Sequence, residues 1–227
     1  MDDITHLTFD CYGTLIAWEQ GILDAVLPVL AAHGADAEPV DVLKRYVEIE
    51  AREEQGAFKP YREVLVAVMR GIGAAYGIAL DDRTCAVLPE SVGAWPAFPD
   101  SVAALAQLAG RYRLVVVSNI DDELFAGSAR SLGDPFAEVV TAKQVRSYKP
   151  GLAHFREAMR RTGAGPSQIL HVAQSLFHDH VPAQSLGMHT AWVERPSRLG
   201  AIGLAPPADV TPTLHVTSLQ ALADRIA

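Results

Sequence analysis

The chain has 227 residues, a formal net charge of −8 at pH 7, 49% hydrophobic residues and 20% charged residues. A chain of this size and composition folds without disulfides or a structural metal, and its acidity argues against nucleic-acid binding. Its two cysteines, Cys11 and Cys85, form no CxxC pair, and no apolar run approaches the roughly 18 residues of a membrane helix. The acidic start does not resemble an export signal. We therefore expect a cytoplasmic protein without nucleic-acid or membrane partners.

Short apolar segments alternate with longer amphipathic ones, which is typical of α/β proteins. Five segments are predicted strands: 4–9, 114–118, 138–141, 169–173 and 190–193. Several are almost entirely apolar, as strands covered by helices on both faces must be. Helices are predicted at 100–110, with Asp100 as N-cap, at 121–133 and at 152–161. The pattern predicts a doubly wound parallel sheet of the Rossmann-like type.

About eighty residues separate the first two predicted strands, and this stretch is helical in pattern almost throughout. Ligands bind beyond the carboxyl ends of the strands in such sheets. An all-helical insert after the first strand is therefore best explained as a cap over those ends. We expect a core made of residues 1–15 and 96–227 and a helical cap made of residues 16–95.

The first predicted strand runs into Asp10-Cys11-Tyr12-Gly13-Thr14-Leu15. A carboxylate at the tip of a central strand is well placed to act as a nucleophile. Gly13 allows close backbone approach to a ligand, and the Thr14 hydroxyl can hold the carboxylate in position. The alternative is an ordinary turn in which Asp10 caps the backbone. From these residues alone, both interpretations stay open.

Further polar groups follow the other predicted strands. Ser118 and Asn119 follow the second strand, and Lys149 precedes a proline and a helix. Asp179 follows the fourth strand by a short loop. Parallel strands place these residues at one sheet edge, where a lysine supplies positive charge to a carboxylate and to developing negative charge. Together they indicate a catalytic site.

These four motifs resemble those of the haloacid dehalogenase superfamily, and the resemblance spans essentially the whole chain. The motif Asp-x-Tyr-Gly-Thr-Leu is similar to that of the L-2-haloacid dehalogenase (type II) branch. Phosphatases of the superfamily carry a second Asp where this chain has Tyr12, and magnesium-dependent members carry an Asp where it has Gln174. Magnesium prefers carboxylate ligands, so the resemblance implies a metal-independent enzyme without a cofactor. Mg²⁺ is expected only if the chain is a phosphatase.

The resemblance implies an aspartyl-ester mechanism on a small carboxylate substrate. Asp10 is the expected nucleophile, Lys149, Thr14 and Ser118 hold it, and Asp179 positions the hydrolytic water. Asn119 is expected to hold the substrate carboxylate. The family cap supplies an Arg near the leaving group, for which this cap offers Lys44, Arg45 and Arg52. The remaining residues that we predict to bind substrate are Cys11, Tyr12, Arg45, Ser175 and His178.

Three alternatives to dehalogenation stay open. The segment Ser175-Leu176-Phe177-His178-Asp179-His180 resembles a side branch that includes L-azetidine-2-carboxylate hydrolase, which opens a strained ring beside a carboxylate. A Mg²⁺-dependent phosphatase and a catalytically silent carboxylate-binding protein are the others. The spacing of the histidines fits no metal cluster. The branch also implies a possible homodimer.

Overall fold

The computed structural model describes residues 3–198 and 208–227. Its six-stranded sheet is parallel throughout, in the order β3-β2-β1-β4-β5-β6. The predicted doubly wound α/β fold is therefore confirmed. The strands are β1 (His6–Phe9), β2 (Arg113–Ser118), β3 (Glu138–Thr141), β4 (Ile169–Ala173), β5 (His189–Val193) and β6 (Leu214–Val216).

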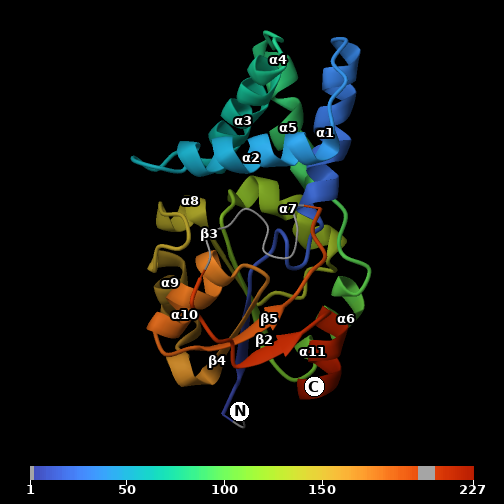
Figure 1. Ribbon diagram of the computed structural model, residues 1–227. Coiled ribbons are helices and arrows are strands. Elements are labelled where there is room, and N and C mark those ends of the chain that lie inside the picture. Colours follow the sequence, from blue (N-terminus) through green and yellow to red (C-terminus); the bar gives the residue numbers. More distant parts are fainter. Residues whose placement is uncertain (1–2, 199–207) are drawn as a thin grey trace.

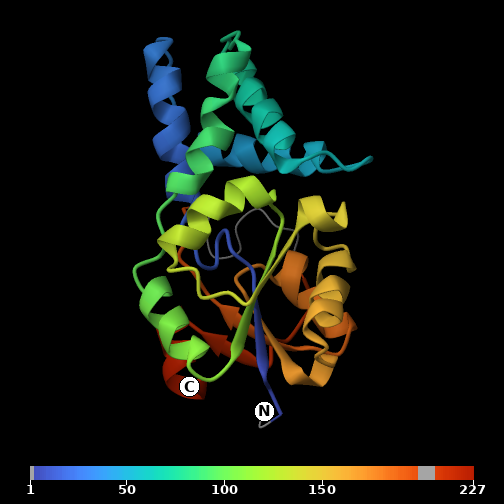
Figure 2. The same ribbon diagram turned by 180° about the vertical axis from the view of Figure 1, so that it is seen from behind.

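Helices cover both faces of this sheet (Figures 1 and 2). On one face α6 (Ser101–Ala109) and α11 (Leu219–Ile226) pack together; on the other lie α9 (Ala153–Thr162) and α10 (Val181–Ser185). Alternate residues of a strand point to opposite faces. In β2, Leu114 accordingly joins the large core on the α6 side, while Val115 joins the smaller core under α9. This two-sided burial explains the unbroken apolar runs of the sequence.

The segment between β1 and β2 forms a group of helices beyond the carboxyl ends of the strands (Figure 1). They are α1 (Trp18–Ala32), α2 (Pro39–Glu53), α3 (Tyr61–Ala75), α4 (Asp82–Cys85), α5 (Val87–Ser91) and the 3-10 turn η1 (Val92–Ala94). We call them the cap helices. Their apolar faces pack mainly against one another, α2 on α3 and α1 on α2 and α5. The chain leaves the sheet region near Ala17 and comes back to it near Pro96. These two points are adjacent, because the Ala17 N–H donates to the Pro96 carbonyl at 2.8 Å.

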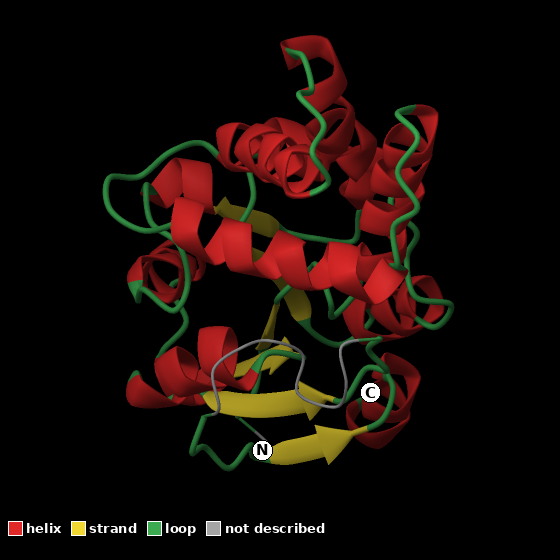
Figure 3. Cartoon of the chain, turned by 45° about the horizontal axis from the view of Figure 1, so that its top comes forward, coloured by secondary structure: helices red, strands yellow, loops and turns green. Residues whose placement is uncertain are grey.

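Short elements connect the strands of the core. They are α7 (Asp122–Ser131), α8 (Ala142–Val145), the 3-10 turn η2 (Pro166–Gln168) and the π-helical turn η3 (Leu176–His180). Figure 3, in which the top of the molecule is turned forward, shows helices above the strands and on either side of them. The loops after β1, β2 and β4 all open toward the cap helices (Figure 1). No helix in the described ranges is long and apolar enough to cross a membrane.

The structure adds two local features that the sequence did not predict. The sheet has a sixth strand, β6, which was not expected because three residues give too little alternation to recognise. Asp100 is the N-cap residue of α6, as expected, but its carboxylate makes no capping hydrogen bond to that helix. It instead accepts from Arg195 Nη1 at 2.8 Å and from the Leu219 N–H at 2.7 Å, and so it joins α6 to the start of α11. A long-range ion pair has replaced the local cap.

Candidate active site

Asp10 lies directly after β1, in a tight turn whose shape depends on the residues that follow it. Gly13 adopts φ +95°, a left-handed conformation that residues with a side chain rarely take. The turn brings Thr14 back, so that its hydroxyl donates to Asp10 Oδ2 at 2.7 Å. The same hydroxyl oxygen accepts the Gln174 N–H at 2.9 Å. Thr14 therefore has a defined donor direction and holds one oxygen of the carboxylate.

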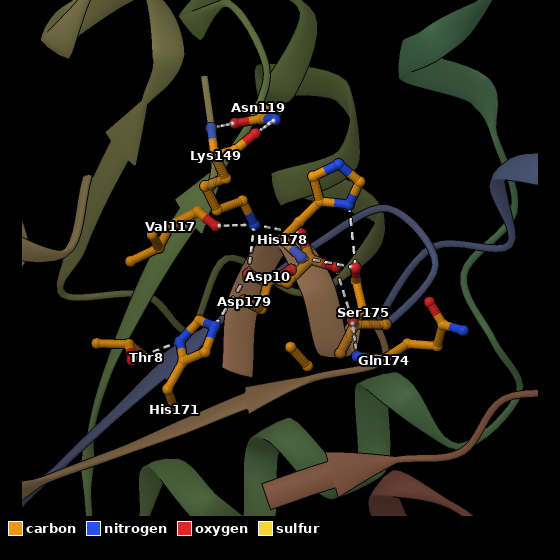
Figure 4. Close-up of polar contacts among 12 residues, drawn as sticks. Thr8, Asp10, Val117, Asn119, Lys149, His171, Gln174, Ser175, His178 and Asp179 are labelled. Carbon is orange, nitrogen blue, oxygen red and sulfur yellow. Dashed lines mark hydrogen bonds and ion pairs between the residues drawn. The ribbon is translucent and has the colours of Figure 1, made fainter. Parts of the chain in front are cut away.

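The Lys149 ammonium group lies between two carboxylates (Figure 4). Its Nζ donates to Asp10 Oδ1 at 2.9 Å, to Asp179 Oδ1 at 2.6 Å and to the Val117 carbonyl at 3.0 Å. Lys149 is only 3% exposed, and three acceptors match its three protons. Burial alone would lower the pKa of Lys149, but the charges of Asp10 and Asp179 outweigh it and raise the pKa. The lysine is thus a permanent cation beside the candidate nucleophile.

Asp179 receives a second hydrogen bond from behind, on the same oxygen. His171 Nε2 lies 3.0 Å from Asp179 Oδ1, and His171 Nδ1 lies 2.8 Å from Thr8 Oγ1 (Figure 4). Burial would raise the pKa of Asp179, yet Lys149 and His171 together lower it below its ordinary value. Asp179 is therefore ionised throughout the neutral range, and a carboxylate with a lowered pKa accepts hydrogen bonds more readily than it takes up a proton.

Asn119 holds the segment that carries Lys149. Its Oδ1 accepts the Lys149 N–H at 2.7 Å, and its Nδ2 donates to the Lys149 carbonyl at 3.3 Å. Asn119 borders the cavity, as Ser118 does, but both ends of its amide are already in use. No hydrogen bond between the Ser118 hydroxyl and Asp10 occurs within the described part of the chain. The lysine is therefore positioned by Asn119, and the nucleophile by Thr14 and Lys149.

The loop after β4 places a histidine in the cavity. Ser175 accepts the backbone N–H of His178 at 3.1 Å, and its hydroxyl lies 3.0 Å from His178 Nδ1. Burial lowers the pKa of His178, so its ring is neutral at pH 7. The ring lies above Asp10 in Figure 4, with Nδ1 directed to Ser175. His178 is thus a neutral polar group beside the nucleophile.

A cavity of about 960 Å³ lies between the carboxyl ends of the strands and the cap helices. Asp10, Lys149 and Asp179 border it from the core. Aromatic and apolar side chains make up much of the rest of its wall; they are Tyr12, Trp18, Val47, Tyr61, Trp95, Phe98, Tyr148 and Phe177. Tyr12 is fixed by a 3.0 Å hydrogen bond between its hydroxyl and Ser128. The cavity thus has a charged floor and a largely apolar wall, a typical form for a small-molecule site.

The cap side of this cavity carries two carboxyl groups. Glu50 on α2 accepts the Tyr46 hydroxyl at 3.1 Å and also accepts the Tyr61 hydroxyl, and the two tyrosine hydroxyls lie 2.8 Å apart. Glu54, one helical turn further on, also borders the cavity. Burial, followed by the charge of Glu50, raises the pKa of Glu54 to about 9. The cap therefore faces the nucleophile with carboxyl groups, of which Glu54 is protonated at pH 7.

Two residues that we predicted to bind substrate do not border the cavity. Arg45 lies on α2 with its guanidinium over the Tyr76 ring, 5.4 Å from the ring centre, because this helix turns its Tyr46 face toward the core. Cys11 is completely buried, and burial raises the pKa of its thiol. Its backbone carbonyl accepts three N–H groups of the turn, including that of Thr14 at 3.2 Å. The side chains of both residues therefore contact other parts of the protein rather than the cavity.

The donor set at Asp10 does not fit a magnesium ion. Mg²⁺ takes oxygen ligands, carboxylates above all. Here Gln174 offers a neutral amide, and the Lys149 ammonium already occupies the space between Asp10 and Asp179. Nowhere in residues 3–198 and 208–227 do three or more His, Cys, Asp or Glu side chains gather in a way that would hold a metal.

Sequence reasoning missed Thr8 and His171 as well as the cap carboxyl groups. Thr8 and His171 face each other in register on β1 and β4, and His171 interrupts the otherwise apolar β4. The presence of a polar residue within each buried strand was the available signal, whereas their pairing was not visible in the sequence. The spacing of Tyr46, Glu50 and Glu54 by four residues was another, since it places all three on one helix face.

Comparisons with known proteins agree on one family. A family model of haloacid dehalogenase-like hydrolases matches residues 4–175. (S)-2-haloacid dehalogenase 1 of Pseudomonas sp. (strain CBS-3) is 23% identical over 212 residues, which cover 91% of each chain. (S)-2-haloacid dehalogenase 4A of Burkholderia cepacia is 25% identical over 233 residues, covering 98% of this chain and 94% of that one. The solved L-2-haloacid dehalogenase of Xanthobacter autotrophicus superposes with a TM-score of 0.83 at 19% identity, over 98% of both chains.

Proposed function

Because the chain belongs to the haloacid dehalogenase-like hydrolases, we propose that it hydrolyses small 2-substituted carboxylates through an ester formed on Asp10. The observation that carries this proposal is the buried contact of Lys149 Nζ with Asp10 and Asp179 at the floor of the cavity. An ionised carboxylate with a fixed orientation and little bulk water around it is an effective nucleophile. The names of the relatives point to a halide as the leaving group.

In the first half-reaction an Asp10 oxygen attacks C2 of the substrate. The new C–O bond forms as the bond to the leaving group breaks, and the bonding electron pair departs with the halide. Lys149 and Thr14 hold the carboxylate in its attacking orientation. A halide leaves without a proton, which suits a motif with Tyr12 in place of a general acid. Burial raises the pKa of Tyr12, so it stays protonated at neutral pH.

In the second half-reaction water attacks the Asp10 carbonyl carbon of the ester. Asp179 orients this water, and the departing oxygen of the 2-hydroxy acid takes up a proton. The cleaved bond lies between the Asp10 carbonyl carbon and the product oxygen, so Asp10 regains its carboxylate with one oxygen from water. The net reaction consumes one water and releases a halide, a proton and a 2-hydroxy acid. Lys149 stabilises the negative charge that develops at the ester carbonyl.

The cap carboxyl groups favour a second candidate, the opening of a small nitrogen ring beside a carboxylate. In-line displacement sends the leaving group away from Asp10 and toward the cap. There the protonated Glu54 can give a proton to a departing amine, whereas carboxyl groups offer little to a departing anion. The nucleophile, the ester and the water are the same in both reactions.

A substrate panel in EDTA tests the function and separates the two leaving groups. We expect halide release from L-2-chloropropionate, measured with a halide electrode. Ring-opened amino acid from azetidine-2-carboxylate, without halide release, would select the second candidate. Ligand-induced thermal stabilisation without turnover would indicate a binding protein. Cleavage of p-nitrophenyl phosphate only after Mg²⁺ is restored would contradict both candidates.

The Asp10→Asn variant tests the nucleophile. We expect turnover to fall by at least about a thousandfold while the thermal midpoint stays near that of the wild type. In a single turnover in ¹⁸O water, label should enter Asp10 before it enters product, as measured by peptide mass spectrometry. Label found only in the product would contradict the ester mechanism.

A further inference from the structure

His171 is a fully buried histidine that the reaction steps above do not use. It lies on β4 and is 0% exposed, with Phe155 packed edge-on at 5.0 Å. Its two ring nitrogens both have partners, Asp179 Oδ1 at 3.0 Å and Thr8 Oγ1 at 2.8 Å. Building on the proposed function, we propose that His171 is a positioning residue for the hydrolytic half-reaction, acting through Asp179.

The partner of His171 Nε2 shows that this ring nitrogen is a hydrogen-bond donor. A carboxylate only accepts hydrogen bonds, so the nitrogen beside Asp179 carries the proton. The other nitrogen, Nδ1, shares a hydrogen bond with the Thr8 hydroxyl, which can act as donor or acceptor. The imidazole is thereby held at both ends, between a residue of β1 and the candidate water-orienting carboxylate. This arrangement resembles the way in which other sites use a second contact to fix a functional side chain.

Lys149 alone does not fix Asp179. Its three protons are divided among Asp10, Asp179 and the Val117 carbonyl. When Asp10 becomes an ester it loses its charge, and the hydrogen bonds of Lys149 readjust at the moment when water must be placed. His171 sits on a central strand and has no contact with Asp10 in the described structure. Its hydrogen bond to Asp179 is therefore the same before and after the ester forms.

The two donors leave one oxygen of Asp179 for water. Lys149 and His171 both bind Oδ1, and no donor within the described residues binds Oδ2. The Asp179 side chain also borders the cavity. With Oδ1 held from two directions, the carboxylate has a fixed orientation, and Oδ2 is the oxygen that remains to accept a hydrogen bond from water.

Removing this contact should slow hydrolysis of the ester and leave its formation nearly unchanged. In His171→Leu we expect the second step to fall about tenfold to a hundredfold, the range set by one hydrogen bond to a charged group. The covalent ester should then accumulate on Asp10 with L-2-chloropropionate, detected by intact-protein mass and by a burst of one halide per enzyme. Thr8→Val, which removes the hydroxyl at nearly constant shape, should slow ester hydrolysis by a smaller factor and accumulate less ester.

A matched control separates positioning from packing. His154 is also fully buried and makes no hydrogen bond to Asp179 in the described structure, so His154→Leu should change the packing without ester accumulation. His171→Gln, which keeps a donor at about the position of Nε2, should restore the second step in part. If His171→Leu melts like the wild type and accumulates no ester, the inference is wrong while the proposed function stands. If the wild type itself forms no ester on Asp10, the proposed function fails.

Discussion

Single residues in this site owe their properties to burial and to the charges beside them. Lys149, Asp179 and Glu54 all border one cavity, yet their pKa values move in different directions. Lys149 and Asp179 neutralise each other, so each keeps its charge. Glu54 accepts no hydrogen bond from the described residues and faces Glu50, which favours the neutral acid. The sequence shows which residues are ionisable, but their ionisation depends on these long-range neighbours.

Glu54 makes stability depend on pH in a way that one substitution removes. Its pKa rises from 4.5 in the unfolded chain to about 9, so the folded state holds the proton more tightly. The associated stability is present below pH 4.5 and is lost as pH rises toward 9. Glu54→Gln should therefore melt at a higher temperature than the wild type at pH 8 and at the same temperature at pH 4, as measured by differential scanning fluorimetry.

Glu53 provides the opposite control for that measurement. The hydrogen bond from Lys59 lowers the pKa of Glu53, so its contribution is stabilising above its ordinary pKa and is lost in acid. Glu53→Gln should then leave the melting temperature unchanged or slightly lower at pH 8. A lower melting temperature for Glu54→Gln at pH 8 would contradict the assignment of a neutral, desolvated Glu54.

At the scale of elements, the helix α3 of the cap receives its N-terminal capping hydrogen bonds from a residue of the core. Asp121, which precedes α7, accepts the N–H groups of Tyr61 and Arg62 at 2.9 and 2.8 Å. These are the first residues of α3, whose own preceding residue is Pro60 with no capping side chain. Tyr148 of the core adds a hydrogen bond from its hydroxyl to the Lys59 carbonyl at 2.8 Å. The start of α3 is thus fastened to the core beside the cavity.

Asp121→Ala should loosen this attachment. We expect a loss of about 1 to 2 kcal/mol in the free energy of unfolding, the usual range for a helix N-cap, and a higher KM because the cap side of the cavity is held less firmly to the core. Urea unfolding and steady-state kinetics measure the two effects. Asp81→Ala is the control: Asp81 caps α4 through the Thr84 N–H at 2.7 Å, within the cap helices, so it should cost stability only. A KM equal to that of the wild type in Asp121→Ala would contradict the role of this contact.

At the scale of the whole molecule, the cavity is larger than a three-carbon acid requires. Its volume of about 960 Å³ lies at the upper end of the range for drug-sized ligands. Apolar wall residues such as Val47 and Phe177 offer contact to an alkyl chain. We expect kcat/KM to hold or rise from 2-bromopropionate to 2-bromohexanoate, by up to about fourfold for each buried methylene. Val47→Phe should reduce the rate for the longer acids alone. A steep fall beyond propionate would contradict this prediction.

The fold class and the polar residues at the strand ends could be predicted from the sequence, because apolar runs and the polar residues that follow them are local signals. Asp10, Thr14, Lys149 and Asp179 meet in the structure as the parallel sheet requires. The partners of Arg45 and Asp100 were beyond reach, since each depends on which face of a helix turns inward. The pairing of Thr8 with His171 depends on strand register, which only the assembled sheet defines.

The central place of β1 in the sheet has a consequence for how the chain acquires its structure. β1 pairs with residues 113–116 and 169–172, so its neighbours are synthesised more than a hundred residues later. Contacts this distant along the chain form slowly, because a large loop must close before they stabilise anything. The cap helices, whose contacts are local, can form before β1, the strand that precedes Asp10, pairs with β2 and β4. Folding of the catalytic turn is therefore a late event, completed only after most of the chain has been made.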